Sequence, residues 1–273
     1  DVSTKANEWL KLGSTINLAY NTQNSGIASW STIPYALYSS PQLAAFNSDG
    51  TYSGPMNDQE YSYSYGNPLA SALNSTRYTE KFNTRGNVFA SITPVKWLTY
   101  KTELSGEMGV NNYNYFMPFY MNGNYVGNAT TQNEHSKTYS VNWTWRNLVN
   151  MDYTFRKIHK ISAVLGHEVN QYRSDYLWAK RQNGSIVLTG LDAGDANFDN
   201  NSGNSTNRSF VSLFGRLFYS YKDRYLFTGS LRNDGSSNFA AGNQWGLFPS
   251  AAFAWRASEE IFFAPLKTSV DNL

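Results

Sequence analysis

Residues 210–239, which read FVSLFGRLFYSYKDRYLFTGSLRNDGSSNF, are the stretch that decides the fold. Apolar and polar side chains alternate through residues 210–221, and the alternation resumes directly after Lys222 and Asp223. A period of two residues is typical of a strand with two unlike faces, and a very short break between two such runs is typical of a hairpin. The stretch therefore predicts two long antiparallel strands, each with an apolar, aromatic face and a polar face.

The same pattern returns along the chain, and no segment has a sustained helical period. We expect strands at residues 9–20, 81–93, 97–110, 140–155, 161–182, 210–221 and 225–232, another within 248–258, and the start of a ninth near the C-terminus. Long polar connections alternate with short turns: the long ones are expected at 23–80, 112–136 and 183–208, and one of medium length at 234–248. This alternation places all long loops at one end of the strands, as in a transmembrane antiparallel β-barrel of the outer membrane.

The composition agrees with this fold class and excludes several functions. Aromatic residues make up 16% of the 273 residues, and they gather at the predicted strand ends, as in the interfacial girdles of barrels. The net charge of +2 gives no basis for binding nucleic acid, and the absence of Cys excludes disulfides and thiolate chemistry. A mean hydropathy of −0.51 is typical of a soluble protein but does not exclude a barrel, because long polar loops dilute the average. A soluble sandwich has no reason to combine strands of this length with one-sided loops.

The two ends of the chain lead to a further expectation. The sequence begins without Met and stops at SVDNL, where another strand starts. We therefore expect residues 1–273 to be part of one barrel domain, a sector of about eight to nine strands of a larger barrel.

The hairpin and its continuation resemble the barrel of SusC/RagA-type TonB-dependent outer-membrane transporters. The matching positions are Phe214, Gly215, Arg216, Tyr219, Tyr221 to Leu226, Arg232, Asp234 to Ser237, Phe239, Gly246, Phe248 to Ser250, Trp255, Arg256 and Glu260. Weaker landmarks follow the family order upstream: NSDGTY at 47–52, NPLA at 67–70, and the run from Asn147 to Glu168.

The resemblance implies a function for the whole protein. It implies a barrel of about 22 strands in the outer membrane of a Gram-negative bacterium, crossing the lipid many times. A SusD-like surface lipoprotein would cap it, and TonB would drive import of a glycan or peptide through a segment and a plug outside this sequence. No catalytic residue and no cofactor are expected.

Charged residues on the polar rows of the strands are the first candidate site, because they should point into the lumen. They are Lys101, Glu103, Glu107, Arg146, Asp152, Glu168, Arg216, Arg232 and Arg256. Cross-strand ion pairs in a wet interior are one interpretation, and contact with a plug or a substrate is the other.

Aromatic residues of the predicted long loops are the second candidate site. Tyr61, Tyr63, Tyr65, Tyr115 and Phe119 are expected to stack on sugar rings, to contact a partner, or to pack within the loops.

Metal and catalytic sites have weaker support in the sequence. Asp195, Asn197, Asp199 and Asn201 have the spacing that begins a calcium loop, but Gly is missing at the sixth position and Glu at the twelfth. We therefore expect a solvated loop at 192–203. The three His residues share no ligand spacing, no G-x-S-x-G motif occurs, and the D-G-S-S string at 234–237 predicts a turn.

Two other function classes stay open on the sequence. A passive porin or surface-adhesion barrel has the same strand pattern without energy coupling. An outer-membrane barrel enzyme needs a nucleophile and a base at the barrel rim.

Overall fold

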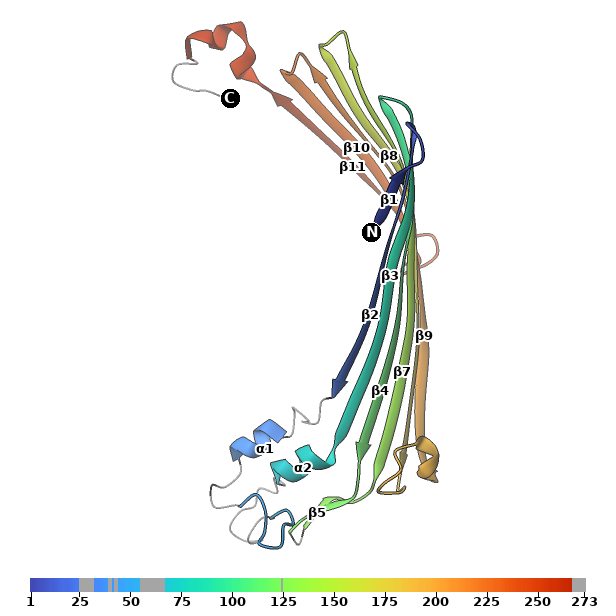
Figure 1. The fold of residues 1–273 in the computed structure, drawn as a ribbon. Coiled ribbons are helices and arrows are strands. Elements are labelled where there is room, and N and C mark those ends of the chain that lie inside the picture. The colour runs from blue at the N-terminus through green and yellow to red at the C-terminus, as the bar shows by residue number, and fades with distance from the viewer. Residues whose placement is uncertain (25–31, 39–40, 42–43, 55–66, 124, 267–273) are drawn as a thin grey trace.

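The computed structural model describes residues 1–24, 32–38, 41, 44–54, 67–123 and 125–266. Its main feature is a nine-stranded antiparallel sheet in the order β1-β2-β3-β4-β7-β8-β9-β10-β11 (Figure 1). The strands are β1 (Val2–Lys5), β2 (Leu10–Asn24), β3 (Thr76–Val95), β4 (Leu98–Met117), β7 (Gln132–Phe155), β8 (His159–Gln182), β9 (Asp195–Tyr221), β10 (Tyr225–Ser236) and β11 (Trp245–Trp255). The all-β, antiparallel fold predicted from the period-two pattern is confirmed.

The remaining elements are small. Two short strands, β5 (Tyr120–Asn122) and β6 (Tyr125–Asn128), pair with each other. The helices are α1 (Thr32–Tyr38) and α2 (Pro68–Asn74), and the 3-10 turns are η1 (Leu191–Ala193), η2 (Ala257–Glu259) and η3 (Ile261–Leu266). Within the described ranges, none of the helices has the length and apolar character that crossing a membrane requires.

The connections alternate in length, as predicted. Tight turns at residues 6–9, 96–97, 156–158 and 222–224 join strands at one end of the sheet. The long connections lie at the other end, where α1, α2 and β5 gather in Figure 1. We call these the tight-turn end and the long-loop end.

The hairpin formed by β9 and β10 turns at Lys222 and Asp223. Lys222 and Asp223 both have positive φ, 51° and 56°, and the Arg224 amide donates to the Tyr221 carbonyl at 3.0 Å. Two central residues with positive φ define a type I′ turn, whose twist matches that of two antiparallel strands. The turn therefore fixes the register in which β9 and β10 pair.

Several predicted boundaries were wrong because the strands are longer than the hydrophobic pattern. β9 begins at Asp195, inside the predicted loop 183–208, and β4 and β7 both extend into the predicted loop 112–136. β1 was not predicted, whereas the strand expected near the C-terminus lies outside the described residues.

The register gives the sheet two unlike faces. On the apolar face, large side chains are exposed: Ile16 is 72% exposed and Leu165 is 63% exposed. The described residues include only three buried apolar side chains, Ala70, Ala257 and Phe263, and none of them lies in a strand of the sheet. The sheet therefore has no core of its own, and its apolar face must be covered by lipid or by another apolar surface.

Candidate functional site

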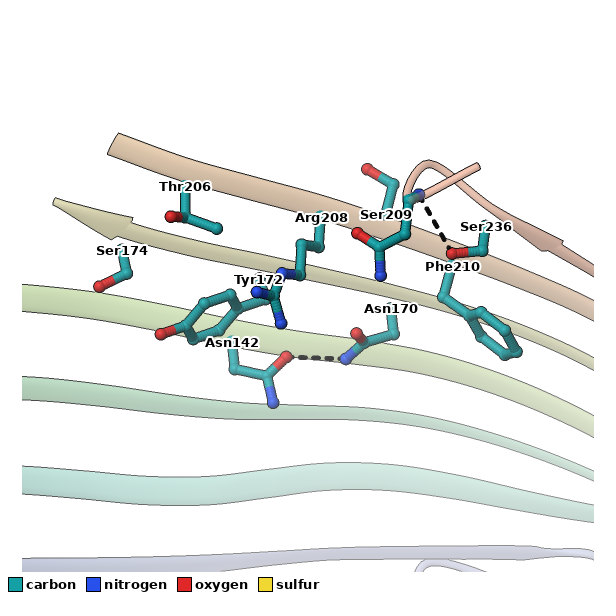
Figure 2. A pocket seen from close by; sticks show the side chains of 10 residues that line it. Asn142, Asn170, Tyr172, Ser174, Thr206, Arg208, Ser209, Phe210 and Ser236 are labelled. Atoms are coloured by element: carbon teal, nitrogen blue, oxygen red, sulfur yellow. Dashed lines mark hydrogen bonds between the residues drawn. The ribbon is translucent and has the colours of Figure 1, made fainter. Parts of the chain in front are cut away.

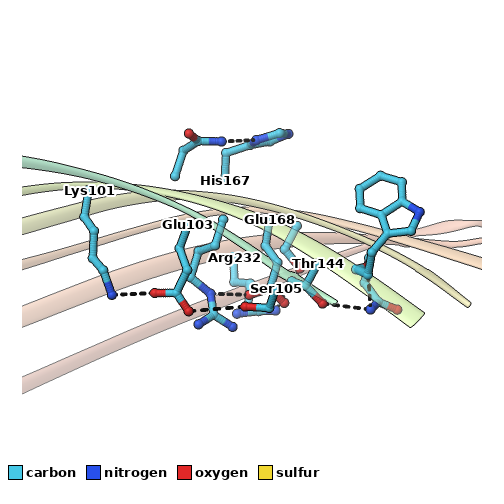
Figure 3. Close-up of polar contacts among 12 residues, drawn as sticks. Lys101, Glu103, Ser105, Thr144, His167, Glu168 and Arg232 are labelled. Carbon is cyan, nitrogen blue, oxygen red and sulfur yellow. Dashed lines mark hydrogen bonds and ion pairs between the residues drawn. The ribbon is translucent and has the colours of Figure 1, made fainter. Parts of the chain in front are cut away.

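The polar face gathers the charges predicted from the sequence. Strand pairing places Glu103, Arg146 and Glu168 directly opposite one another on β4, β7 and β8. Counting in steps of two from these positions puts eight of the nine predicted charges on this face. They are Lys101, Glu103, Glu107, Arg146, Asp152, Glu168, Arg216 and Arg232. Figure 3 shows the labelled members of this group on one side of the sheet and His167 on the other.

The ninth predicted charge was misplaced. β11 ends at Trp255, so Arg256 does not continue the polar row of that strand. Its guanidinium donates to the Asp223 carbonyl at 3.3 Å, and its amide donates to the Arg224 carbonyl at 2.8 Å. Arg256 therefore ties β11 to the neighbouring tight turn.

Seven of the polar-face residues form a connected band across β4, β7, β8, β9 and β10, which we call the charged belt. Its members are Lys101, Glu103, Arg146, Glu168, Ser212, Arg232 and Asp234. Ser212 lies opposite both Glu168 and Asp234, which continues the row from β8 to β10. The belt thus forms one level across the face.

The charges of the belt are paired with one another. Arg146 Nε lies 2.6 Å from Glu168 Oε2, and Lys101 contacts Glu103 on the same strand. Arg232 Nε donates to both Asp234 oxygens at 2.8 Å and its Nη2 donates to Ser212 Oγ at 2.7 Å. Ser212 is fully buried beneath this contact. Charged groups with hydrogen-bonded partners have little capacity left for a ligand.

Aromatic rings lie over glycines within the same level. A Cβ on Gly166 would lie 2.1 Å from Phe214 Cζ, so the ring rests directly on the glycine backbone. The Arg232 guanidinium lies 5.1 Å from the centroid of the same ring, a cation–π distance. On the other side of the belt, Phe89 covers Gly13 and Lys101 Nζ lies 4.9 Å from that ring. Gly166 and Gly13 therefore make the space in which the rings and cations stack.

Two other predicted charges on this face have local partners. Glu107 Oε1 accepts from Arg85 Nη2 at 2.9 Å, and Asp152 Oδ1 accepts from Ser162 Oγ at 2.6 Å. No ion pair involves Arg216 in the described part of the chain, so it is an open cation on β9, on the tight-turn side of the belt.

A polar hollow lies on the same face, farther toward the long-loop end (Figure 2). It has a volume of about 470 Å³. Asn142, Tyr172 and Arg208 lie directly opposite one another on β7, β8 and β9, and Asn170 lies opposite Phe210 one step closer to the belt. We call this the amide hollow. The sequence interpretation did not single out Tyr172, Arg208 or Phe210, although Arg208 and Phe210 continue the period-two row that leads to Ser212.

The aromatic residues predicted in the long loops lie in different kinds of structure. Tyr115 was predicted in a loop but lies in β4, where the Arg77 guanidinium lies 4.8 Å from its ring centroid and its hydroxyl contacts Met117 Sδ at 3.2 Å. Phe119 follows β4 and is 47% exposed, as a contact residue of a loop should be. Tyr61, Tyr63 and Tyr65 lie outside the described residues.

The calcium-like spacing does not form a loop. Asp195, Asn197, Asp199 and Asn201 lie in β9, where alternate side chains share one face instead of converging on an ion. Among the described residues, no group of three or more His, Cys, Asp or Glu side chains could hold a metal. The D-G-S-S turn was also misplaced, because β10 continues through Ser236 and carries Asp234 into the belt.

The three histidines lie apart and have separate contacts. His167 is on the apolar face, 3.5 Å from Asn147 Nδ2 and in edge contact with the Trp145 ring. His159 Nδ1 lies 2.7 Å from the Tyr219 hydroxyl at the tight-turn end, and His135 Nε2 lies 3.1 Å from the Thr189 carbonyl. In the described part of the chain, none of the three forms a hydrogen bond with a Ser, Thr or Cys side chain, the usual nucleophiles of acyl transfer.

The tight-turn end holds a second paired cluster, built from the K-D-R-Y and W-R stretches. Lys160 donates to Asp223 Oδ2 at 2.7 Å and thereby lowers the pKa of that carboxyl below its ordinary value. Glu260 accepts from the Tyr225 hydroxyl at 2.7 Å and from Arg224 at 3.1 Å, and these contacts, led by the hydroxyl, lower its pKa as well. These residues lock β8, β9, β10 and the segment after β11 together.

Several known proteins are similar to this chain. No family model matches the chain. It is 27% identical over 262 residues to the TonB-dependent receptor P39 of Formosa agariphila. The matched region covers 95% of this chain and 24% of that receptor. It is 44% identical over 77 residues to the TonB-dependent receptor SusC of Bacteroides thetaiotaomicron, 28% of this chain and 8% of that receptor. The chain thus spans about a quarter of the first of these relatives.

A solved structure has the same fold. The structure of the RagAB peptide transporter superposes with a TM-score of 0.79 over 95% of this chain and 30% of its own chain, at 20% sequence identity. At that identity the match establishes the fold alone. Together with the curated relatives, it confirms the resemblance seen in residues 210–239: this chain is similar to a section of the barrel of SusC-like TonB-dependent transporters.

Proposed function

We propose that this chain forms part of the wall of an outer-membrane importer that takes up a glycan or a peptide with energy supplied through TonB. The observation that carries the proposal is the similarity to a TonB-dependent receptor along 95% of the chain. The two-faced sheet supports it, because an exposed apolar face suits lipid and a polar, charged face suits a water-filled lumen.

The proposal places residues 1–273 in one barrel domain of a Gram-negative outer membrane. The long-loop end would face the cell exterior, where a SusD-like surface lipoprotein would cap the barrel. The tight-turn end would face the periplasm, and a plug inside the barrel would respond to TonB. Transport breaks no covalent bond of the nutrient, so the proposal assigns no catalytic residue and no cofactor to this chain.

The charged belt has a defined part in this proposal. Its ion pairs would keep the wall rigid at one level of the lumen, and the open cation of Arg216 beside it would contact the plug. A wall of this kind can hold a movable plug without binding it too tightly, because most of its charges are already paired with each other.

The test is purification of the full-length native protein from outer membranes, followed by mass spectrometry of everything that co-purifies. We expect plug peptides from the same polypeptide and a surface lipoprotein in equal amount. Nutrient uptake by the cells should also stop when TonB is deleted. A barrel that purifies without plug peptides and works without TonB would instead be a passive porin or an adhesin, and the proposal would be wrong.

A further inference from the structure

The amide hollow differs from the charged belt because several of its functional groups have no partners. Within the described part of the chain, the side chains of Tyr172, Ser174, Thr206 and Arg208 make no hydrogen bond or ion pair. Figure 2 shows them projecting from neighbouring strands, and none of the dashed lines drawn there reaches these four side chains. A guanidinium and three hydroxyls are thus left free at one place.

The two amides of the hollow are held in fixed orientations. Asn170 Nδ2 donates to Asn142 Oδ1 at 2.7 Å, to Thr144 Oγ1 at 2.9 Å and to the Trp143 carbonyl at 3.1 Å. These contacts leave the Asn170 carbonyl oxygen and the Asn142 amino group without protein partners among the described residues. The hollow therefore offers an oriented acceptor and an oriented donor in addition to the free hydroxyls.

The side chains of the hollow suit a sugar better than a peptide. β7, β8 and β9 are paired continuously through this level, whereas β10 pairs with β9 only as far as Phe210 and leaves the outer edge of β9 open beside the hollow. Its lining is made of amides, hydroxyls and the rings of Tyr172 and Phe210, without an aliphatic pocket for a peptide side chain. Dense hydroxyls and flat ring faces are the features of a sugar chain, which amides and aromatic rings complement.

The charge of the hollow further restricts the class of ligand that it can bind. Arg208 contributes a guanidinium whose planar fork matches a carboxylate or a sulfate, and no described acidic side chain pairs with it. The acid in the same register row is Glu107, three strands away on β4 and bound to Arg85 Nη2 at 2.9 Å. Asp175 on the neighbouring strand β8 is on the opposite face and is bound to Arg173 Nε at 2.9 Å. An unpaired arginine in a site made for hydroxyls favours a sugar that carries negative charge.

We propose that the amide hollow is a binding subsite for an acidic oligosaccharide, with Arg208 on the carboxylate or sulfate and the Tyr172 and Phe210 rings beside the sugar. This inference rests on the proposed import function, because a subsite on the polar face serves a ligand that passes through the lumen. It narrows the nutrient from a glycan or peptide to an anionic glycan.

The experiment is calorimetric titration of the purified full-length protein, with the partners that co-purify. The probes are trigalacturonate, a sulfated galactose oligosaccharide, neutral maltotriose and tri-glutamate. We expect at least one anionic saccharide to bind roughly tenfold more tightly than maltotriose. Arg208→Gln should weaken that binding by roughly tenfold or more and leave maltotriose almost unchanged.

The chain offers a matched control and a second variant. Arg173→Gln makes the same change on β8, beside Tyr172 but on the opposite face, and it should alter no saccharide affinity. Tyr172→Ala should weaken anionic and neutral saccharides alike, because it removes a ring instead of a charge. Migration of unheated samples in detergent gels shows whether each variant is folded.

Three outcomes would overturn the inference. One is equal affinity for anionic and neutral saccharides, the second is full retention of anionic binding in Arg208→Gln, and the third is tri-glutamate as the ligand that this variant loses. These outcomes are independent of the import test. If the protein co-purifies with plug peptides and a lipoprotein but shows no preference for anionic saccharides, only this inference is wrong. If it proves to be a porin that binds anionic sugars through Arg208, only the proposed import is wrong.

Discussion

The charged belt and the amide hollow lie on the same face of the same strands, yet they use their polar groups in opposite ways. In the belt, Arg146, Glu168, Arg232 and Asp234 are bound to one another. In the hollow, the side chains of Arg208, Tyr172 and Thr206 have no partners among the described residues. Paired groups stabilise a wall, whereas unpaired but oriented groups are available to a ligand. The position of a polar residue in the lumen therefore says less about its role than its partners do.

The largest effect should come from filling the space beneath the Phe214 ring. Gly166→Val places side-chain atoms where the ring lies, since even a Cβ would be 2.1 Å from it. The ring and the Arg232 cation above it must move, and we expect a loss of about 1–3 kcal/mol in the free energy of unfolding. Urea titration of the full-length protein in detergent measures this.

The control for that change is Gly106→Val on β4. A Cβ at Gly106 would have no atom within 4 Å, so the same substitution should change stability by less than about 0.5 kcal/mol. Equal losses at the two glycines would mean that the ring stack does not hold the belt.

The second effect separates the belt from the hollow directly. Arg146→Gln removes the partner of Glu168, a carboxylate whose side chain is only 20% exposed, and should cost about 1 kcal/mol in unfolding free energy. Arg208→Gln removes a cation with no partner and should cost less than about 0.5 kcal/mol. If Arg208→Gln were the more destabilising, the hollow would be a structural site and its role in binding would need another explanation.

The sequence could predict the faces of the strands but not their lengths. Alternation is strong where one face is apolar, as in residues 210–221, and it disappears in residues 195–209, where both faces are largely polar. Pairing of β8 with β9 nevertheless continues through Arg181 and Asp199. Backbone hydrogen bonds extend the strands beyond the region that the hydrophobic pattern reports, so the predicted loops were too long.

The same limit explains why the candidate site was only half predicted. The charges of the belt stand out in a polar row and were found by their period. The hollow depends on register, which brings Asn142, Tyr172 and Arg208 level on three strands, and Arg208 lay in a predicted loop. Asp234 was missed because its D-G-S-S context is typical of a turn. Partners and register are tertiary properties, and a single sequence does not display them.

A third, smaller effect compares two ion pairs of the same kind. Arg146–Glu168 and Arg85–Glu107 both join directly opposite residues on neighbouring strands of the polar face. The first pair has side-chain exposures of 44% and 20%, and the second has 72% and 42%. Double-mutant cycles with Gln should give a coupling of about 0.5–1 kcal/mol for the first pair and close to zero for the second. A coupling that is larger for the exposed pair would show that the belt gains nothing from its network.

The smallest expected effect lies at the tight-turn end, where paired acids meet water instead of the lumen. The pKa of Asp223 is lowered from its ordinary 3.8 by the Lys160 contact, and that of Glu260 is lowered from 4.5, chiefly by the Tyr225 hydroxyl. An acid whose pKa is lower in the folded state stabilises the fold fully above its ordinary pKa, and this contribution is lost as the pH falls through the lowered value. The urea midpoint of the full-length protein should therefore fall as the pH drops below 4.5, and the fall should be smaller in an Asp223→Asn, Glu260→Gln variant. Because the Asp223 side chain is 51% exposed, salt should weaken its part of the difference between the two proteins. The variant and the unmodified protein could instead show identical pH profiles. The turns would then be held together by the Arg256 contacts with the backbone, and ion pairs would stabilise only the charged belt.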